Sequence, residues 1–326
     1  MTARWTWHGG GIDAARLHYG ESDAPWIDLS TGINPHAWPG VEALTIDWRS
    51  LPGRGALTDL EAAAAAYFGV EPRHVCAVPG TEVGLRIAGG LIGGSARYVG
   101  PTYRTHGEMI PSSQPIAAEA LAGERGTLIL ANPNNPDGRI WSRDALLDLL
   151  GGRAADAWLM LDEAFADTDP ALSLAGNIDE DARLLIFRSF GKFFGLAGVR
   201  LGFVLGPVAI LDRLRGALGA WPVSAAALAI GTAAYRDRDW IEAMRRRLPA
   251  DAAALDAVLA RHGHVAIGGS PLFRLIEVDD GMALFDRLAR QAILTRPFAE
   301  QPRWLRIGLP GDAAALARLD AALADG

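Results

Sequence analysis

A single lysine lies in the stretch RSFGKFFGLAGVRLGF, which runs from residue 188 to residue 203 and is otherwise rich in small and apolar residues. Lys192 has a serine three positions before it and an arginine eight positions after it. A lysine is rarely buried without a partner or a chemical task. Lys192 is therefore a candidate for chemistry, and the alternative is a lysine that extends from a strand end into water.

Other reactive residues follow the short apolar stretches that we predict to be strands. In open parallel sheets, ligands bind beyond the carboxyl ends of the strands. CAVPG leads to Gly80, Thr81 and Glu82 at the start of a helix, where free N–H groups and the helix dipole suit an anion. The remaining strand ends supply an aromatic ring, amides, a carboxylate, a hydroxyl and two cations: Tyr103, Asn132, Asn134, Asn135, Asp162, Ser189, Lys192 and Arg200. This set suits a planar, phosphorylated cofactor with a cationic nitrogen.

The elements that must position these residues alternate between strand and helix. We predict helices over 56–70, 81–92 and 142–153, and buried strands within 74–80, 95–99, 126–131, 157–162, 183–189 and 199–206. Thr58 or Asp59 is expected near the start of the first helix and Gly69 past its end, and Ser142 is the expected N-cap of the third. This alternation indicates a three-layer α/β fold with a mainly parallel sheet covered on both faces.

The pattern changes from about residue 207. Long helices are predicted over 208–218, 224–236 and 240–263, with Pro249 as a possible bend, followed by strands at 272–278 and 304–309. We therefore predict three parts. Residues 1–30 form an N-terminal arm that packs with the small domain, residues 31–215 form a large cofactor-binding domain, and residues 216–326 form a small α+β domain.

Composition narrows the class of protein. The 326 residues carry a net charge of −7, which argues against nucleic acid as the main partner. Cys76 is the one cysteine, so an internal disulfide is impossible and a reducing, cytoplasmic location is expected. The first residues lack the apolar core of a signal peptide, and we expect no membrane span. No metal site is predicted.

Three motifs in order carry a family resemblance. NPNNPDG, DEAF and SFGK followed by VRLGF resemble the fold-type I pyridoxal-phosphate enzymes, the aspartate aminotransferase superfamily. Asn135 precedes Asp162 by 27 residues, and Asp162 precedes Lys192 by 30 residues. The resemblance covers nearly the whole chain. It implies pyridoxal 5'-phosphate as the cofactor, the aspartate-aminotransferase type of fold and a homodimer.

The resemblance implies a role for each residue at the strand ends. Lys192 would form a Schiff base with the cofactor, because apolar surroundings disfavour the ammonium and free the amine as a nucleophile. Asp162 would pair with the protonated pyridine nitrogen. Asn135 would bind the ring 3-hydroxyl, and Tyr103 would stack on the ring. His106 would support Asp162, and the alternative is a histidine in a surface loop.

Anionic groups have their own predicted ligands. Ser189, Arg200 and the backbone of Gly80, Thr81 and Glu82 would hold the cofactor phosphate, although Arg200 could instead form a salt bridge at a strand edge. By the same resemblance, Arg306 in WLRIGL would bind the substrate carboxylate as a bidentate fork. Without the resemblance, Arg306 would read as an ordinary exposed arginine.

The N-terminus narrows the choice within the family. HGGGIDAARLHYG followed by STGINP resembles the enzymes of cobalamin biosynthesis that decarboxylate L-threonine O-3-phosphate to (R)-1-amino-2-propanol O-2-phosphate. This makes His8, Gly9, Gly10 and Asn34 candidates for the substrate pocket, and the alternative is an arm and a turn that merely pack. Phe165 stands where many aminotransferases of the family have tyrosine. The main alternative activity is an aminotransferase, such as one acting on histidinol phosphate.

The sequence also departs from its relatives at several positions. Leu51 stands where a tyrosine often reaches the cofactor phosphate of the neighbouring subunit, and Arg49 or Arg54 is a candidate substitute. Asp137 replaces a common threonine. Arg139 follows, and we interpret it as a ligand of the substrate phosphate, with a solvated turn residue as the alternative. A ligand-sensing domain of a regulator is disfavoured because neither end carries a basic helix-turn-helix candidate.

Overall fold

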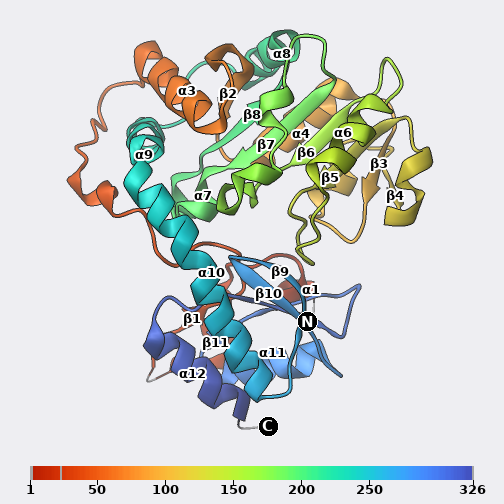
Figure 1. The fold of residues 1–326 in the computed structure, drawn as a ribbon. Coiled ribbons are helices and arrows are strands. Elements are labelled where there is room, and N and C mark those ends of the chain that lie inside the picture. The colour runs from red at the N-terminus through yellow and green to blue at the C-terminus, as the bar shows by residue number, and fades with distance from the viewer. Residues whose placement is uncertain (1–2, 23, 325–326) are drawn as a thin grey trace. The chain divides into compact units, whose positions relative to one another are not determined.

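Seven strands between residues 75 and 205 pair into one sheet in the computed structural model, which describes residues 3–22 and 24–324 (Figure 1). Their order is β2-β8-β7-β6-β5-β3-β4. The strands are β2 (Val75–Val78), β3 (Ala96–Val99), β4 (Gln114–Ile116), β5 (Thr127–Ala131), β6 (Leu159–Asp162), β7 (Leu184–Ser189) and β8 (Gly202–Leu205). The mainly parallel sheet is confirmed, and only β8 runs antiparallel to its neighbours β2 and β7.

Helices connect and cover these strands. They are α3 (Arg54–Phe68), α4 (Thr81–Ile92), α5 (Thr105–Glu108), α6 (Arg143–Gly151), α7 (Phe190–Phe193), α8 (Val208–Leu218) and α9 (Ala225–Arg236). Ser142 caps α6, because its hydroxyl accepts the N–H of Ala145 at 3.2 Å. Gly69 ends α3 in the left-handed conformation that glycine adopts without strain. The first helix begins four residues before Thr58, after Gly53.

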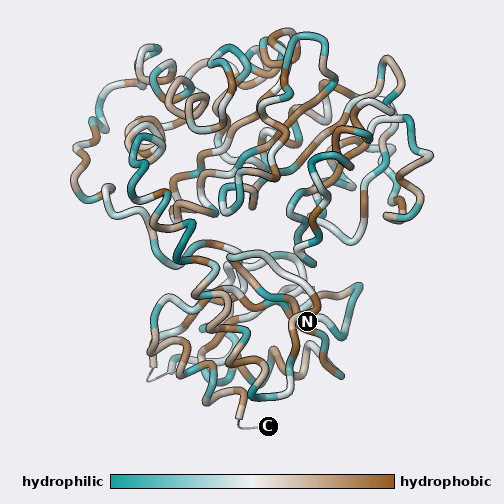
Figure 2. The backbone as a smooth tube through the Cα atoms, viewed as in Figure 1, coloured by the Kyte–Doolittle hydropathy of each residue, from teal (hydrophilic) through white to brown (hydrophobic). Residues whose placement is uncertain are grey.

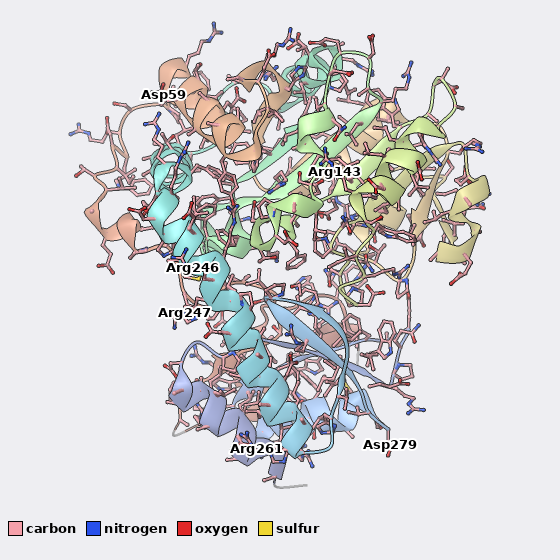
Figure 3. All side chains as sticks on the ribbon, viewed as in Figure 1. Asp59, Arg143, Arg246, Arg247, Arg261 and Asp279 are labelled. Carbon is pink, nitrogen blue, oxygen red and sulfur yellow. The ribbon has the colours of Figure 1, made fainter. Side chains whose placement is uncertain are left out.

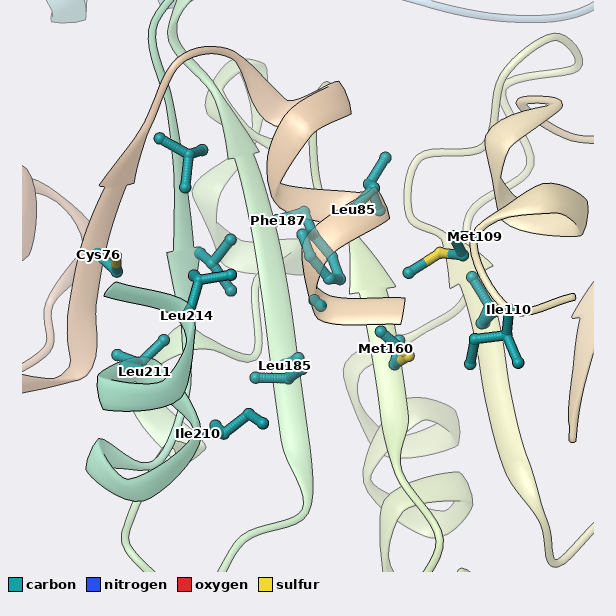
Figure 4. Close-up of a cluster of buried hydrophobic side chains, with 14 of the residues drawn as sticks. Cys76, Leu85, Met109, Ile110, Met160, Leu185, Phe187, Ile210, Leu211 and Leu214 are labelled. Atoms are coloured by element: carbon teal, nitrogen blue, oxygen red, sulfur yellow. The ribbon is translucent and has the colours of Figure 1, made fainter. Parts of the chain in front are cut away.

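Both faces of the sheet are buried. One face packs against α4 and α8 in a cluster that includes Leu85, Phe187 and Leu214 (Figure 4). Leu130 and Ile186 point to the other face, because side chains alternate along a strand, and they are also fully buried. Figure 2 shows the same pattern, because the tube along the central strands has the colour of hydrophobic residues. Burial on both faces explains why these strands read as continuous apolar runs rather than as alternating ones.

A second unit is built from both ends of the chain. Its antiparallel sheet has the order β12-β13-β10-β9, from β9 (Ala266–Ser270), β10 (Phe273–Glu277), β12 (Arg296–Pro297) and β13 (Trp304–Gly308). β1 (Ile27–Asp28) pairs in parallel with β11 (Ile293–Leu294). Its helices are α1 (Ala3–Thr6), α2 (Ile12–Tyr19), α11 (Gly281–Arg290) and α12 (Ala313–Ala324), together with α10 (Arg238–Arg261) from Met244 onward. α10 continues through Pro249, and exposed arginines such as Arg246 and Arg261 project from it (Figure 3).

The boundaries between the two units lie at other residues than the predicted domain boundaries. Residues 37–135 and 139–243 cluster together as the large unit. The described parts of 1–36, 136–138 and 244–326 form the small unit. Residues 216–243 belong to the large unit because α9 packs against α3. The arm shares a unit with the C-terminal residues, and the segment 31–36 lies with it rather than in the large unit.

Within the described residues, no helix combines the length and the apolar character needed to cross a membrane.

Candidate active site

One cavity in the large unit gathers the residues that the sequence assigned to a cofactor. It opens where β5, β6 and β7 end and α4 begins. Its lining includes all nine predicted cofactor ligands and the phenylalanine of DEAF: Gly80, Thr81, Glu82, Tyr103, Asn135, Asp162, Phe165, Ser189, Lys192 and Arg200. Because parallel strands deliver their carboxyl ends to one edge of the sheet, residues up to 120 positions apart meet there.

A hydrogen-bonded chain orients the carboxylate of this cavity. Asp162 is the last residue of β6 and is nearly buried. Its Oδ2 lies 3.0 Å from Nε2 of His106, and its Oδ1 accepts the N–H of Ala164 at 3.0 Å. Nδ1 of His106 lies 3.0 Å from the hydroxyl of Thr102. His106 is therefore a fully buried partner of Asp162 rather than a histidine in a surface loop, and Thr102 is a member of the chain that the sequence did not predict.

The start of α4 forms an anion cradle. Gly80 precedes the helix at φ 91°, a conformation that favours glycine. A Cβ at Gly80 would lie 2.7 Å from Nη2 of Arg200, so a larger residue here would displace the guanidinium from its present position. The hydroxyl of Thr81 donates to the carbonyl of Arg188 at 3.0 Å, which ties the helix start to β7 next to Ser189. Free helix N–H groups, a guanidinium and hydroxyls are the donors that a phosphate needs.

Tyr103 is held by a carboxylate. Its hydroxyl donates to Oε2 of Glu82 at 2.9 Å, and Thr105 and Arg86 also donate to Glu82. Burial, together with the charge of Glu82, raises the pKa of Tyr103 to about 12, so the phenol stays neutral at physiological pH. The sequence assigned only the backbone of Glu82, and the structure adds that its side chain orients the aromatic ring at the cavity.

Lys192 lines the same cavity as Asp162 and Phe165. It is half-buried on α7, between the buried residues Gly191 and Phe193. Its Nζ lies 5.9 Å from the centre of the Phe165 ring, within the range of a cation–π contact. Phe165 is itself buried and offers no hydroxyl to the cavity.

A buried ionic cluster lies next to the site and was missed in the sequence. Arg188, beside Ser189, donates from Nη1 to Glu163 at 2.8 Å and to the hydroxyl of Ser173 at 3.1 Å, and from Nη2 to Asp167. Burial raises the pKa of Glu163, and Arg188 opposes that effect. The two carboxylates raise the pKa of Arg188 despite its burial. The only sequence signals were the glutamate of DEAF and the arginine that precedes Ser189.

The predicted substrate residues other than Arg139 lie in the small unit. Arg306 on β13 is 7% exposed, so it is not the exposed arginine that its sequence alone suggested. Its Nη2 donates to the carbonyl of Ser30 at 2.8 Å. Burial, assisted by the charge of Arg296, lowers the pKa of Arg306 to about 9. Asn34 is buried, and its Oδ1 accepts the N–H of His36 at 2.9 Å.

The HGG element also lies in the small unit. His8 is exposed, and its Nδ1 lies 2.9 Å from the carbonyl of Gly9. The N–H of Gly10 donates to the hydroxyl of Ser30 at 2.8 Å. In the large unit, Arg139 is half-buried, and its Nη2 lies 3.5 Å from the carbonyl of Gly100. Over residues 3–22 and 24–324, no group of three or more His, Cys, Asp or Glu side chains is arranged to hold a metal ion.

Comparison with known proteins gives a consistent result. Residues 112–323 match the family model for aminotransferase class I and II. The chain is 41% identical to a threonine-phosphate decarboxylase of a Sinorhizobium species over 97% of both chains. It is 39% identical to the threonine-phosphate decarboxylase of Pseudomonas aeruginosa over 97% of this chain and 96% of that protein. Its fold is similar to the crystal structure of histidinol-phosphate aminotransferase from Sinorhizobium meliloti in complex with pyridoxal-5'-phosphate, with a TM-score of 0.83. The sequence identity is 21%, and the match covers 96% of this chain and 94% of that chain.

Proposed function

The chain belongs to the aminotransferase class I and II family, and from that premise we propose that it decarboxylates L-threonine O-3-phosphate. The products are carbon dioxide and (R)-1-amino-2-propanol O-2-phosphate, an intermediate of cobalamin biosynthesis. The observation that carries the proposal is the identity of about 40% to two threonine-phosphate decarboxylases, which extends over 97% of this chain and so includes most of the N-terminal arm.

The residues of the large-unit cavity fit pyridoxal 5'-phosphate. When bound, this cofactor supplies a conjugated ring that accepts electrons. Lys192 offers the amine that holds it covalently, Asp162 a carboxylate for the ring nitrogen, and Asn135 an amide for the 3-hydroxyl. Tyr103 offers a flat face held by Glu82. The space that Gly80 leaves beside Arg200, together with Thr81 and Ser189, suits the phosphate.

The reaction breaks the bond between Cα and the carboxylate. The bonding electrons stay on the Cα side, carbon dioxide leaves, and Cα takes up one proton. Lys192 Nζ is the group that we assign to deliver this proton. Asp162 would offer its carboxylate to the ring nitrogen of the bound cofactor, and His106 and Thr102 hold that carboxylate in one orientation.

The substrate carries two anionic groups, and each needs its own ligands. We assign the carboxylate to Arg306, whose planar guanidinium binds a carboxylate in a bidentate manner. The phosphate is assigned to His8, Gly9, Gly10, Asn34 and Arg139. Fixing both anions would set the torsion about the N–Cα bond of the bound substrate, so that the Cα–carboxylate bond, the one that breaks, stands perpendicular to the conjugated plane. Phe165 withholds the hydroxyl that many aminotransferases place near the ring.

We also propose a homodimer, located in the cytoplasm. Two large apolar residues of the segment 47–53 are exposed, Trp48 at 76% and Leu51 at 67%. The same segment and α9 line a groove of the large unit. A contiguous exposed apolar patch is typical of a protein interface. Leu51 stands where relatives carry the tyrosine that reaches the neighbouring subunit, so this surface suits a second copy of the chain.

A paired assay tests the activity. The protein loaded with pyridoxal phosphate is incubated with L-threonine O-3-phosphate, and carbon dioxide and aminopropanol phosphate are measured. Histidinol phosphate with 2-oxoglutarate is assayed in parallel. We expect carbon dioxide release that Lys192→Ala abolishes. Glutamate formation from the second mixture, without carbon dioxide from the first, would instead identify an aminotransferase.

A further inference from the structure

Ser30 joins two parts of the small unit to which we assign substrate binding. Its hydroxyl accepts the N–H of Gly10 in the arm at 2.8 Å. Its carbonyl accepts Nη2 of Arg306 from β13 at 2.8 Å. Ser30 is 2% exposed, and its bond to Arg306 is buried, whereas its bond to Gly10 is partly buried. One residue therefore contacts the element assigned to the phosphate and the arginine assigned to the carboxylate.

Asp28 fixes Ser30 in this position. Its Oδ1 accepts both the hydroxyl of Ser30, at 2.5 Å, and the backbone N–H of Ser30, at 2.9 Å. Because the hydroxyl proton goes to Asp28, the lone pairs of the oxygen are directed to Gly10. The next residue along, Leu29, accepts the N–H of Gly308 on β13 at 2.7 Å. The peptide of Ser30 is thus tied to the strand that carries Arg306.

The arm packs closely on the same carbonyl. A Cβ at Gly9 would lie 2.3 Å from the carbonyl oxygen of Ser30, the oxygen that binds Arg306. Gly11, two residues along the arm, has open space around the corresponding position. Arg296, directly opposite Arg306 in the β12–β13 pair, donates to the carbonyls of Thr6 and Trp7 at 3.2 and 3.1 Å. The arm before Gly9 is therefore fastened to the strand pair that carries Arg306.

We propose that Ser30 is a positioning residue that couples the HGG element to Arg306 and so sets the spacing between the two anion sites of the substrate. This inference rests on the proposed function. Its consequence is specific: a disturbance of the arm at Gly9 reaches Arg306 through the carbonyl of Ser30. A ligand that has a carboxylate and no phosphate should then respond to a substitution in the phosphate element.

The test measures binding to the enzyme loaded with pyridoxal phosphate, through the absorbance of the bound cofactor. L-Threonine serves as the ligand with a carboxylate and no phosphate, and aminopropanol phosphate as the ligand with a phosphate and no carboxylate. We expect Gly9→Ala to weaken the affinity for both ligands by about tenfold, the size of one disturbed charged hydrogen bond. Gly11→Ala should leave both within about twofold of the wild-type values.

Ser30→Ala is an independent test of the coupling that introduces no steric clash. It removes the acceptor of the Gly10 N–H and keeps the carbonyl that binds Arg306. We expect a loss of roughly three- to tenfold in affinity for aminopropanol phosphate and a smaller loss for L-threonine. Ser270→Ala is the matched control, because Ser270 is equally buried in the small unit and its hydroxyl accepts the N–H of Leu272 at 3.1 Å. Circular dichroism and the unfolding midpoint of each variant check the fold.

Two results would overturn the coupling. In the first, a folded Gly9→Ala variant binds L-threonine with the wild-type affinity, or Gly11→Ala lowers that affinity as much as Gly9→Ala does. In the second, Ser30→Ala and Ser270→Ala have the same effect on the affinity for aminopropanol phosphate. This comparison is the decisive one if Gly9→Ala does not fold. Failure of the proposed function has a different signature, because wild-type enzyme would then release no carbon dioxide from L-threonine O-3-phosphate.

Discussion

Single residues of the large-unit cavity, and Arg306 in the small unit, are fixed by hydrogen-bond partners. Asp162 is held by His106 and a backbone N–H, Tyr103 by Glu82, and Arg306 by the carbonyl of Ser30. A catalytic group that is already oriented loses little freedom when substrate binds, which favours the reacting geometry. Substitution of these partners therefore tests the proposed roles as directly as substitution of the proposed cofactor ligands.

His106→Asn tests the support of Asp162. The substitution removes the imidazole nitrogen 3.0 Å from Oδ2 of a nearly buried carboxylate. We expect the rate of carbon dioxide release to fall by roughly tenfold to a hundredfold, the cost of a hydrogen bond to a charged group, with weaker retention of pyridoxal phosphate on dialysis. Thr102→Val removes the partner of Nδ1 and also the hydroxyl that donates to Oδ1 of Asn134 at 2.8 Å, but it leaves the contact between His106 and Asp162 in place and should have the smaller effect. Unchanged activity and retention in His106→Asn would contradict the assigned support.

We expect Arg306, the proposed ligand of the substrate carboxylate, to give the enzyme a pH dependence. Burial lowers its pKa to about 9, so the guanidinium loses its proton, and its attraction for a carboxylate, as the pH rises above 9. We expect KM for L-threonine O-3-phosphate to rise about tenfold per pH unit beyond that point. Binding of aminopropanol phosphate is the reference, because that ligand shares the amine and lacks the carboxylate. If both ligands weaken in parallel, Arg306 does not bind the carboxylate.

The elements of the large unit meet at buried polar contacts as well as in the apolar core. Arg188 at the end of β7 joins Glu163, which follows β6, to Asp167 and Ser173 in the loop beyond. Glu163 and Asp162 are adjacent, as are Arg188 and Ser189. The cluster thus fixes the ends of β6 and β7, from which two of the proposed cofactor ligands project.

Arg188→Met should destabilise the protein strongly, because it leaves two buried carboxylates without their cation. We expect a loss of about 3–5 kcal/mol in the free energy of unfolding at pH 8. Burial raises the pKa of Glu163, so the folded state binds a proton more tightly than the unfolded state, and the loss should shrink as the pH falls toward 5. Urea unfolding at both pH values measures this.

Arg183→Met is the matched control for that experiment. Arg183 precedes β7, is exposed, and lies 5.5 Å from the centre of the Trp158 ring. Its loss should cost less than about 1 kcal/mol. A cost for Arg188→Met that equals this value, or that grows as the pH falls, would refute the role assigned to the cluster.

At the scale of the whole molecule, the proposed dimer depends on the segment 47–53. Leu51→Glu replaces an exposed apolar side chain of the groove with a charge, which a second copy could cover only at the cost of burying that charge. We expect sedimentation to show a shift from dimer to monomer, with a loss of bound pyridoxal phosphate. Val265→Glu alters an equally exposed apolar residue in the small unit and should leave the dimer intact. A wild-type chain that sediments as a monomer would falsify the proposal.

Much of the fold and of the cofactor site was predictable from local sequence. The runs TLILA, LMLD and LLIFRS are short and apolar because both faces of the sheet are buried, and each ends in a residue that lines the cavity or lies next to it. Three motifs in order, NPNNPDG, DEAF and SFGK, carried the family resemblance, which the family model and the relatives confirm. The Ser142 cap and Gly69 are also local features, since they depend on hydrogen bonds and dihedral angles within one turn.

Only the tertiary structure decided which polar residues act together. His106 reaches Asp162 across 56 positions, Arg188 reaches Glu163 across 25, and Ser30 reaches Arg306 across 276. Nothing in the local pattern around Arg188 or Arg306 distinguishes a buried arginine from an exposed one. Burial and ion pairing depend on the neighbours that chain folding brings from distant positions. The sequence by itself therefore determined the elements and the chemical types at their ends, whereas the contacts that orient those groups arise from packing.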